Sequence, residues 1–278
     1  MDLAKLSPQL TRGADGIWIP RREGARVDLS FPKDGHEVTF RLEDESFWVQ
    51  HRNACIFHAL HRVSFEGLLL DVGAGNGVVS QALERGGLST VVLEPALQGA
   101  RNARRRGLAN VVCATLDDAD FEERSFGAAG VFDVIEHVED DVAVLRSVHR
   151  VLRPGGALCV TVPAYPWLWS AEDELAGHFR RYTLASLRET LVKSAFDVRY
   201  ETYFFATMTL PVFLMRTLRH RLGQRSMARV EESAVAVHDL STISRRMVTL
   251  ALAPELRLIR SGKKIPVGTS CLVVATKA

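Results

Sequence analysis

The chain has 278 residues, of which 47% are hydrophobic and 24% charged, and its formal net charge at pH 7 is +2. This composition indicates an ordinary globular chain, long enough for one large α/β domain with attachments or for two small domains. The near-neutral charge gives no case for a nucleic acid partner, and no apolar run is long enough to span a bilayer.

The cysteines and the N-terminus bear on the cellular compartment. Cys55, Cys113, Cys159 and Cys271 are far apart in sequence and form no C-x-x-C pair. That spacing argues against a zinc ribbon, so we expect no metal, and it favours reduced thiols. The first residues, MDLAKLSPQLTRG, lack the apolar core of a signal peptide. We therefore expect a cytoplasmic protein.

Residues 1–44 predict a small β appendage. They are rich in glycine, proline and charge, with short alternating pieces at 16–20, 26–31 and 37–42. Asp34-Gly35 between the last two pieces is a hairpin signal. The appendage would cover a sheet edge or wall a substrate site. From Asp44 the pattern becomes helical, and its apolar face includes Trp48 and Cys55.

Residues 68–80, LLLDVGAGNGVVS, read as a buried strand, a glycine-rich turn and the start of a helix. Such a unit forms the nucleotide end of a doubly wound α/β sheet, because glycine lets the backbone approach a ligand closely. A dinucleotide fingerprint, G-x-G-x-x-G, would need glycine where Val78 stands. Instead the glycines follow a G-x-G-x-G pattern with an acid in front: Asp71, Gly73, Gly75 and Gly77.

This motif resembles the first motif of the class I S-adenosylmethionine-dependent methyltransferases, D/E-x-G-x-G-x-G. The resemblance implies a Rossmann-like seven-stranded sheet whose last strand is antiparallel. It also implies S-adenosyl-L-methionine as cofactor, with S-adenosyl-L-homocysteine as product. An acid in front of the loop suits the cationic amino acid tail of that donor.

Further cofactor positions follow the next two strands. A strand over 90–93 ends at Glu94 and Pro95, at about the spacing where an acid accepts hydrogen bonds from ribose hydroxyls. The helix over 96–106 carries a run of arginines that we read as a solvated face. After a strand over 110–114, the resemblance places Leu116 and Asp117 beside the adenine, with Asp118 and Asp120 as rivals.

The fourth strand, over 126–132, leads into D-V-I-E-H-V at 133–138. This segment resembles the ubiquinone-biosynthesis-like group of methyltransferases. The resemblance places Phe132 and Asp133 near the methionine part of the cofactor and His137 in the cleft. A helix over 141–152 and the turn Pro154-Gly155-Gly156 precede a strand over 157–162.

The segment 163–183, PAYPWLWSAEDELAGHFRRYT, follows a strand end on the ligand side and combines prolines, aromatic rings, acids and bases. We expect it to bind the acceptor, and either His178 or His137 to act as general base. G-H-x-R-R-Y-T resembles a branch of bacterial methyltransferases found in surface-polysaccharide and lipid-related settings. Arg180 and Arg181 favour an anionic acceptor, or pair with Glu172 or Asp173. The candidate substrate residues are Tyr165, Trp169, Glu172, Arg180, Arg181 and Tyr182.

Thr183 can cap the next helix, and strands are expected over 197–204 and 270–277. A helical insertion over 206–266 separates them. Residues 203–225 are apolar and then basic, which suits a core helix, a membrane interface at the inner face, a lid over the acceptor or a homodimer contact. A second helix over 242–252 would bury Ile243, Met247 and Leu250 and break at Pro254. The expected divisions are 1–44 for the appendage, 45–205 and 267–278 for the core, and 206–266 for the insertion.

These features predict transfer of a methyl group to an oxygen or nitrogen of a small-molecule, saccharide or lipid-linked acceptor. The alternative is a catalytically silent module that keeps the fold to bind a partner. Val78 and the lack of a second cofactor motif disfavour a dehydrogenase.

Overall fold

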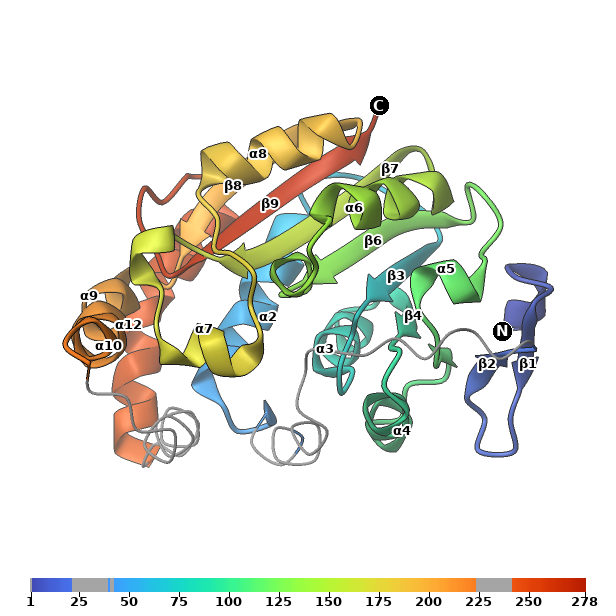
Figure 1. Cartoon of the computed structure of the whole chain (residues 1–278), viewed down its shortest axis with the longest axis horizontal. Helices are drawn as coiled ribbons and strands as arrows, with labels where there is room; N and C mark the ends of the chain where they lie inside the picture. Colours follow the sequence, from blue (N-terminus) through green and yellow to red (C-terminus); the bar gives the residue numbers. More distant parts are fainter. Residues whose placement is uncertain (1, 22–39, 41–42, 224–241) are drawn as a thin grey trace.

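The computed structural model describes residues 2–21, 40, 43–223 and 242–278 (Figure 1). The predicted piece 26–31, nearly all of 37–42, the Asp34-Gly35 turn and Arg225 lie outside these residues.

One mixed sheet forms the centre of the molecule, with the order β1-β2-β5-β4-β3-β6-β7-β9-β8. The strands β3, β4, β6 and β7 are parallel, and β9 lies antiparallel between β7 and β8. The predicted seven-stranded sheet with an antiparallel last strand is therefore confirmed. Its strands are β1 (Leu10–Arg12), β2 (Trp18–Pro20), β3 (Leu68–Val72), β4 (Ser89–Leu93), β5 (Val111–Val112), β6 (Phe126–Phe132), β7 (Leu152–Pro163), β8 (Phe196–Phe204) and β9 (Ser270–Lys277).

The N-terminal appendage continues this sheet. β1 and β2 form an antiparallel hairpin, and β2 pairs with β5 through Trp18 and Val112. The amide of Cys113 donates to the Trp18 carbonyl at 2.8 Å. The hairpin covers the open edge of β5, so the observed sheet has nine strands.

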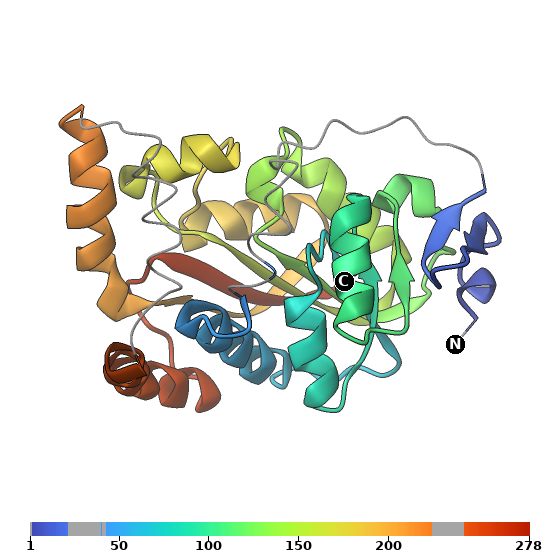
Figure 2. The same ribbon diagram turned by 90° about the horizontal axis from the view of Figure 1, so that it is seen from below.

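Helices cover both faces of the sheet (Figures 1 and 2). On one face, α5, α6 and α8 pack on alternate residues of the strands, such as Leu70 and Val160. On the other face, α2, α3 and α12 pack on Leu69 and Leu272, and α4 packs on Val92. The longer helices are α2 (Phe47–Leu60), α3 (Val78–Arg85), α4 (Leu97–Arg105), α6 (Asp141–Val151), α8 (Leu184–Lys193) and α12 (Thr242–Arg260).

Shorter helices carry the connections on the ligand side. α5 (Leu116–Ala119) follows β5, and α7 (Ala171–Ala176) lies between β7 and α8. After β8 the chain runs through α9 (Thr209–Val212), a π-helical turn η5 (Phe213–Thr217) and α10 (Leu218–Arg221). Thr183 caps α8 as predicted, because its hydroxyl accepts from the amide of Ser186 at 3.1 Å.

The strand order fixes where a ligand can bind. β3 pairs with β4 on one side and with β6 on the other. After β3 the chain therefore adds strands first on one side of β3 and then on the other, so the strand order reverses at β3. In open α/β sheets the ligand crevice lies at this reversal, beyond the carboxyl ends of the strands. The glycine-rich turn follows β3 directly.

The second predicted helix of the insertion differs from the structure. α12 continues through Pro254 to Arg260, and Met247 and Leu250 are 67% and 72% exposed rather than buried. Leu252, Glu255 and Ile259 are buried instead. A proline inside a helix leaves the carbonyl four residues earlier without its N–H partner. Here that carbonyl belongs to the exposed Leu250, where water can bond it.

Arg101 and Arg105 of the arginine run are exposed, as expected for a solvated face, but Arg106 is not. Arg106, which follows α4, has a side chain only 2% exposed. Its guanidinium bonds Glu43 at 2.8 Å and the Asn76 carbonyl at 3.0 Å, and it also pairs with Asp44. Arg106 therefore fixes the chain ahead of α2 to the glycine-rich turn.

Candidate functional site

A cavity of about 660 Å³ opens at the carboxyl ends of β3, β4 and β6. Its size is within the range of about 300–1,000 Å³ that is typical of small-molecule sites. Every predicted cofactor residue except Gly77 lines it: Asp71, Gly73, Gly75, Glu94, Pro95, Leu116, Asp117, Phe132 and Asp133.

The three glycines of the turn have different roles. All three have positive φ, between +55° and +74°. A methyl group on Gly73 would lie 2.8 Å from Val134, and one on Gly77 would lie 2.6 Å from Leu108. A methyl group on Gly75 would meet nothing within 4 Å, because Gly75 faces the cavity. Gly77 thus serves the packing of α3 against α4, whereas Gly75 leaves space for a ligand.

Two buried carboxyl groups flank the turn. Glu94 accepts hydrogen bonds from the amides of Gly75 and Ala96, both at 2.7 Å, and Asp71 accepts one from the Ser80 hydroxyl at 2.6 Å. Burial raises the pKa of Glu94 to about 7 and that of Asp71 to about 6, while these hydrogen bonds oppose the shift. Both groups would be more stable as carboxylates beside a cation, so this end of the cavity suits a positively charged ligand.

The far wall of the cavity is set by the turn after β5. Leu116 is buried, and Asp117 is exposed at the rim, where its carboxylate accepts from the Ser147 hydroxyl at 3.3 Å. Of the two rival acids, Asp118 bonds the Thr115 hydroxyl at 2.7 Å. Neither Asp118 nor Asp120 lines the cavity.

A second, smaller cavity of about 180 Å³ adjoins the first. Asp133, His137 and His178 line both cavities and so mark their junction. Asp133 has a φ of +56° and accepts hydrogen bonds from Arg52 at 2.5 Å and Thr161 at 3.2 Å. The remaining walls are Trp48, Glu136, Pro163, Arg181, Val212, Arg216, Thr269 and Ser270.

His178 is held at the junction by a buried acid. Its Nδ1 lies 2.8 Å from Oδ1 of Asp173, which also accepts from Nε of Arg181 at 2.7 Å. Burial alone would raise the pKa of Asp173, but the bonds from His178 and Arg181 outweigh it and lower the pKa to about 2. Asp173 is therefore ionised, and it fixes the His178 ring so that Nε2 is left for other partners.

Three buried polar atoms around the second cavity have no hydrogen-bond partner among the described residues. They are Oε2 of Glu136, Nδ1 of His137 and Oγ1 of Thr269. The ligand atoms of Glu136, His137 and His178 lie within 4.8 Å of one another, so one polar atom or cation could bridge them. Buried polar atoms in native proteins are nearly always satisfied, so this cluster points to a missing partner.

The protonation of this cluster follows from its surroundings. Burial and the nearby Asp133 carboxylate raise the pKa of Glu136 well above its ordinary value. Burial lowers the pKa of His137 to about 4, and the neighbouring His178 imidazole adds to that shift. At neutral pH, His137 is therefore an uncharged imidazole, and burial favours the protonated, uncharged form of Glu136.

Most of the candidate substrate residues have structural partners outside the two cavities. Tyr165 stacks on Trp167 and Tyr203, and the buried Tyr182 donates to Asp141 at 2.7 Å. Trp169 also lies outside the lining.

The charged members of that set are paired. Glu172 pairs with Arg216 at 3.3 Å, and Arg180 bonds the Glu139 carbonyl at 2.6 Å. Of the candidate set, Arg181 alone lines either of the two described cavities. It pairs with Asp173, as one of the two interpretations of the sequence predicted. The substrate role of these residues remains a prediction.

Sequence reasoning missed Glu136, Thr269 and Arg216 as cavity residues. Glu136 stands within D-V-I-E-H-V, so a motif signal was available for it. Thr269 precedes β9, and Arg216 lies in the insertion. Thr269 and Arg216 are far from the glycine-rich turn in sequence, so the sequence does not indicate that they line the same cavity.

A family model described as a methyltransferase domain matches residues 70–160. Solved structures share the fold over most of the chain. S-adenosylmethionine-bound phosphoethanolamine N-methyltransferase 2 of Haemonchus contortus has a TM-score of 0.57 at 17% identity, over 93% of this chain and 61% of that one. A methyltransferase of Thermotoga maritima, described as a possible histamine N-methyltransferase, has a TM-score of 0.54 at 17% identity, over 88% and 95%. Residues 70–160 thus match a methyltransferase domain, and the chain has the fold of S-adenosylmethionine-dependent methyltransferases, as the resemblance predicted.

Sequence relatives are ubiquinone biosynthesis O-methyltransferases. That of Xanthomonas oryzae pv. oryzae (strain PXO99A) is 33% identical over 96 residues, which are 32% of this chain and 40% of the relative. That of Xylella fastidiosa (strain M23) is 30% identical over 131 residues, or 41% and 53%. The chain thus spans about half the length of these relatives. No helix in the described part of the chain could cross a membrane.

Proposed function

We propose that this chain uses S-adenosylmethionine to methylate an oxygen or nitrogen of a small acceptor. One observation carries the proposal: the open face of Gly75 and the buried Glu94 border a large cavity that joins a smaller polar one. A donor in the first cavity and an acceptor in the second would meet at Asp133, His137 and His178.

The residues of the first cavity fit this donor. Gly73 and Gly75 would allow its close approach, Glu94 would accept from its ribose, and Leu116 would pack on its adenine. Asp71 would face its ammonium group. When bound, the donor supplies a methyl group on a positively charged sulfur, which needs no further activation. The protein then has to position the acceptor, which contributes up to about 7–11 kcal/mol in favourable cases.

Isothermal titration calorimetry tests this proposal. The full chain should bind S-adenosylmethionine and S-adenosylhomocysteine at one site and should not bind NAD. Glu94→Ala should weaken both interactions, whereas Glu84→Ala on α3 should weaken neither. Absence of donor binding would favour the silent module. Donor binding, together with transfer of a labelled methyl group to a component of a cell extract, would support the proposal that the chain is an enzyme.

The acceptor is a finer part of the proposal. The sequence relatives are named as O-methyltransferases, and one of the solved neighbours as an N-methyltransferase. A small molecule fits the second cavity as a whole. A saccharide or lipid-linked acceptor would place only its reacting end there, because the cavity volume is about 180 Å³.

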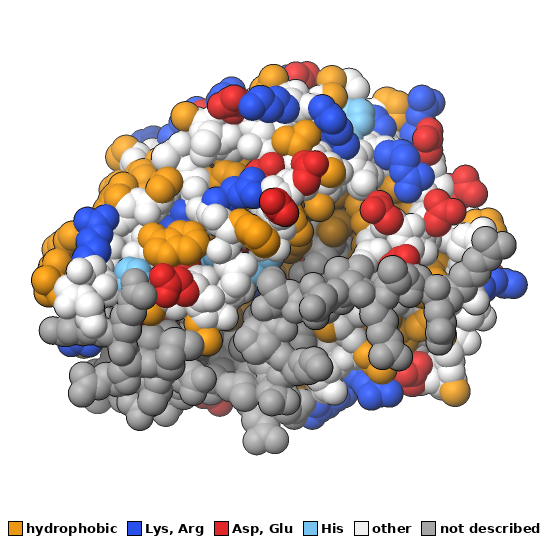
Figure 3. All heavy atoms as spheres, in the orientation of Figure 1, with side chains coloured by type: hydrophobic (Ala, Val, Ile, Leu, Met, Phe, Trp, Pro, Cys, Tyr) orange, Lys and Arg blue, Asp and Glu red, His pale blue; other side chains and the backbone are white. Residues whose placement is uncertain are grey.

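The surface of α9, η5 and α10 supports peripheral contact with an anionic membrane. Leu210, Leu214, Met215 and Leu222 are 63%, 47%, 64% and 65% exposed. Arg219 and Arg221 are exposed on the same segment. Figure 3 shows hydrophobic and basic side chains together at this end of the molecule. Apolar side chains with arginines beside them match the boundary between acyl chains and anionic head groups. A second copy of the chain is the alternative occupant.

A further inference from the structure

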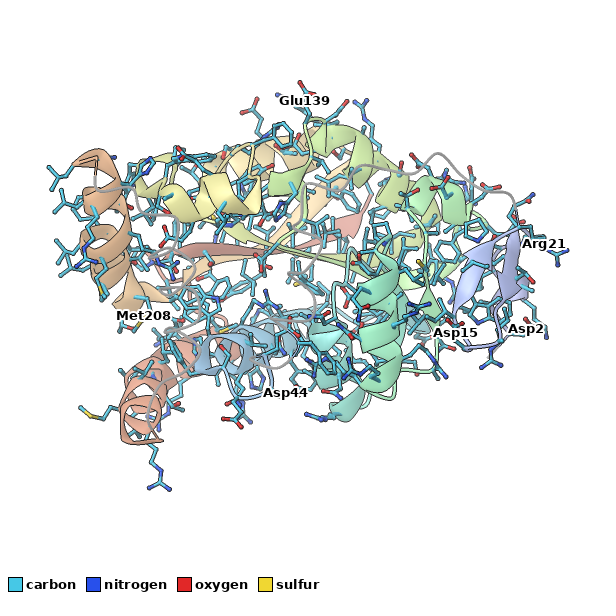
Figure 4. All side chains as sticks on the ribbon, turned by 60° about the horizontal axis from the view of Figure 1, so that its bottom comes forward. Asp2, Asp15, Arg21, Asp44, Glu139 and Met208 are labelled. Atoms are coloured by element: carbon cyan, nitrogen blue, oxygen red, sulfur yellow. The ribbon has the colours of Figure 1, made fainter. Side chains whose placement is uncertain are left out.

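A cluster of metal-ligating side chains lies away from both cavities, at the contact between α2 and α12. His51 and Cys55 are one turn apart on α2, and Glu255 is on α12. The two helices lie side by side on one face of the sheet (Figure 4). None of these three residues lines either of the two described cavities, so the cluster lies outside the proposed donor and acceptor sites.

The three ligand atoms are close enough to share one ion. Nε2 of His51 lies 2.7 Å from Oε1 of Glu255 and 3.4 Å from Sγ of Cys55, and all three atoms lie within 4.8 Å of one another. A tetrahedral zinc ion separates its nitrogen and sulfur ligands by about 3.6 Å and its nitrogen and oxygen ligands by about 3.3 Å. The nitrogen–sulfur distance is therefore close to that of a zinc site. The His51 ring and the Glu255 carboxylate would move apart by about 0.6 Å to admit the ion.

The cluster is closed to solvent and carries a buried acid. Cys55 is fully buried, and the side chains of His51 and Glu255 are 9% and 5% exposed. Glu255 accepts hydrogen bonds from the amides of Phe205 and Ala206, both at 2.7 Å. Within the described part of the chain, no lysine or arginine pairs with this carboxylate. A buried carboxylate without a permanent cation beside it favours the binding of one.

The hydrogen bonds within the cluster cannot all form at once. An imidazole nitrogen either carries a proton or accepts one. If Nε2 of His51 donates to Glu255, it cannot accept from the Cys55 thiol, which has no other acceptor among the described residues. If Nε2 accepts the thiol proton instead, its contact with the Glu255 carboxylate lacks a proton. A metal ion resolves this conflict, because it binds a lone pair of each of the three atoms.

We infer that His51, Cys55 and Glu255 bind one Zn²⁺ ion, which fastens α12 to α2. Zinc takes nitrogen, sulfur and carboxylate ligands, whereas Mg²⁺ and Ca²⁺ take oxygen ligands. Water or the second oxygen of Glu255 would complete the tetrahedron. Binding forms a zinc–sulfur bond and releases the thiol proton to solvent. The spacing of the cysteines predicts no metal, but this site needs a single cysteine and a carboxylate 204 positions away from His51.

The zinc ion would also fix one wall of the second cavity. Glu255 holds the amides of Phe205 and Ala206 where β8 ends. The Phe205 ring stacks on that of Trp48 with ring centroids 3.7 Å apart, and Trp48 lines the second cavity. Because the ion binds only the folded arrangement of α2 and α12, Zn²⁺ should raise the melting temperature of the chain.

Metal titrations of the untagged full chain test the inference. After a chelator has removed bound metal, calorimetry should show one Zn²⁺ per chain with a Kd below about 1 μM and release of one proton. Co²⁺ in the same site should give the near-ultraviolet absorption of a cobalt–thiolate bond, because Cys55 is a ligand. A folded chain that binds no Zn²⁺, or that binds Co²⁺ without this absorption, would overturn the inference.

Two variants separate a metal site from a hydrogen-bonded contact. His51→Gln keeps a side chain that can donate to Glu255, but an amide is a poor zinc ligand, so the affinity for Zn²⁺ should fall by about 100-fold or more. Cys55→Ser should lower it by a similar factor and abolish the cobalt–thiolate absorption. His58→Gln, on the same helix, and Cys113→Ser are matched controls that should bind Zn²⁺ as the wild type does.

A further variant excludes the other cluster of possible ligands in the described part of the chain, Glu136, His137 and His178. His178→Asn should leave the affinity for Zn²⁺ unchanged. If His178→Asn lost the ion while His51→Gln and Cys55→Ser kept it, the ion would belong to the second cavity and the inference would fail. Donor binding in the same samples tests the proposed function separately, because the zinc ligands do not line the donor cavity.

Discussion

Oδ1 of Asp173 lies 2.8 Å from Nδ1 of His178, and the same carboxylate binds Arg181 at 2.7 Å. Asp173 is fully buried within the capping box of α7, so this short helix holds the histidine by a rigid contact. The imidazole lies where the two cavities meet, which are the proposed donor and acceptor cavities.

This relationship predicts the effect of removing the base. His178→Asn should lower the rate of methyl transfer by about 10²–10⁴-fold, because a positioned base contributes that much. The affinity for S-adenosylmethionine should stay within about twofold, since the glycine turn and Glu94 are unchanged. His61→Asn, on the exposed end of α2, is the control. Near-normal turnover of His178→Asn would rule His178 out as the base and leave His137 as the candidate.

Because Gly75 faces the cavity, a substitution there should affect ligand binding in addition to the stability of the fold. Gly75→Ala and Gly155→Ala both place a methyl group at positive φ, +55° and +72°, with nothing within 4 Å. Each should therefore lower the free energy of unfolding by about 1–2 kcal/mol. Only Gly75→Ala fills space in the donor cavity, so it alone should weaken S-adenosylmethionine binding, by about tenfold or more. Thermal unfolding and calorimetry measure the two effects, and equal Kd values in the two variants would contradict the placement of the donor.

The raised pKa of Glu94 predicts the pH dependence of donor binding. Burial raises this pKa to about 7, and a bound cation would lower it again. Binding of S-adenosylmethionine should therefore release protons and tighten as the pH rises from about 6 to 8. Calorimetry in buffers of different ionisation enthalpy measures this release. Glu94→Gln should show a smaller release, and an unchanged release would exclude Glu94 as its source.

The same shift has a consequence for stability. Between the ordinary value of 4.5 and about 7, Glu94 holds its proton in the folded state but not in the unfolded state. Its contribution to the free energy of unfolding is therefore present at low pH and is lost as the pH rises through about 7. The stability of wild type relative to Glu94→Gln should fall over this window. Urea titrations at a series of pH values check the sign, and a rise would contradict it.

The exposed surface of α9, η5 and α10 predicts binding to anionic vesicles. The chain should sediment with phosphatidylglycerol vesicles more than with phosphatidylcholine vesicles, and less so at high salt. Leu214→Ser with Met215→Ser should reduce this by about tenfold, because two apolar side chains no longer enter the interface. Val192→Ser, at a 61% exposed position on α8, is the control. If the double variant instead dissociated a dimer and still sedimented with the vesicles, the surface would be the contact with a second copy of the chain.

Local sequence determined a large part of this protein. The acid-led glycine turn needs positive φ at Gly73, Gly75 and Gly77, and a buried strand before it, so it could be recognised from residues alone. The strand boundaries of β6 and β9 follow directly from runs of apolar residues between polar turns. The helix cap at Thr183 is likewise a contact between residues three positions apart.

Tertiary structure alone decided the rest, because it depends on contacts between distant segments. The burial of Arg106 required Glu43. Helix α12 continues through Pro254 because the carbonyl that the proline leaves without a partner belongs to the exposed Leu250. The second cavity brings Glu136, Arg216 and Thr269 to one wall from three parts of the chain. Periodicity and spacing report on neighbours along one element, whereas a cavity wall is set by how separate elements pack against one another.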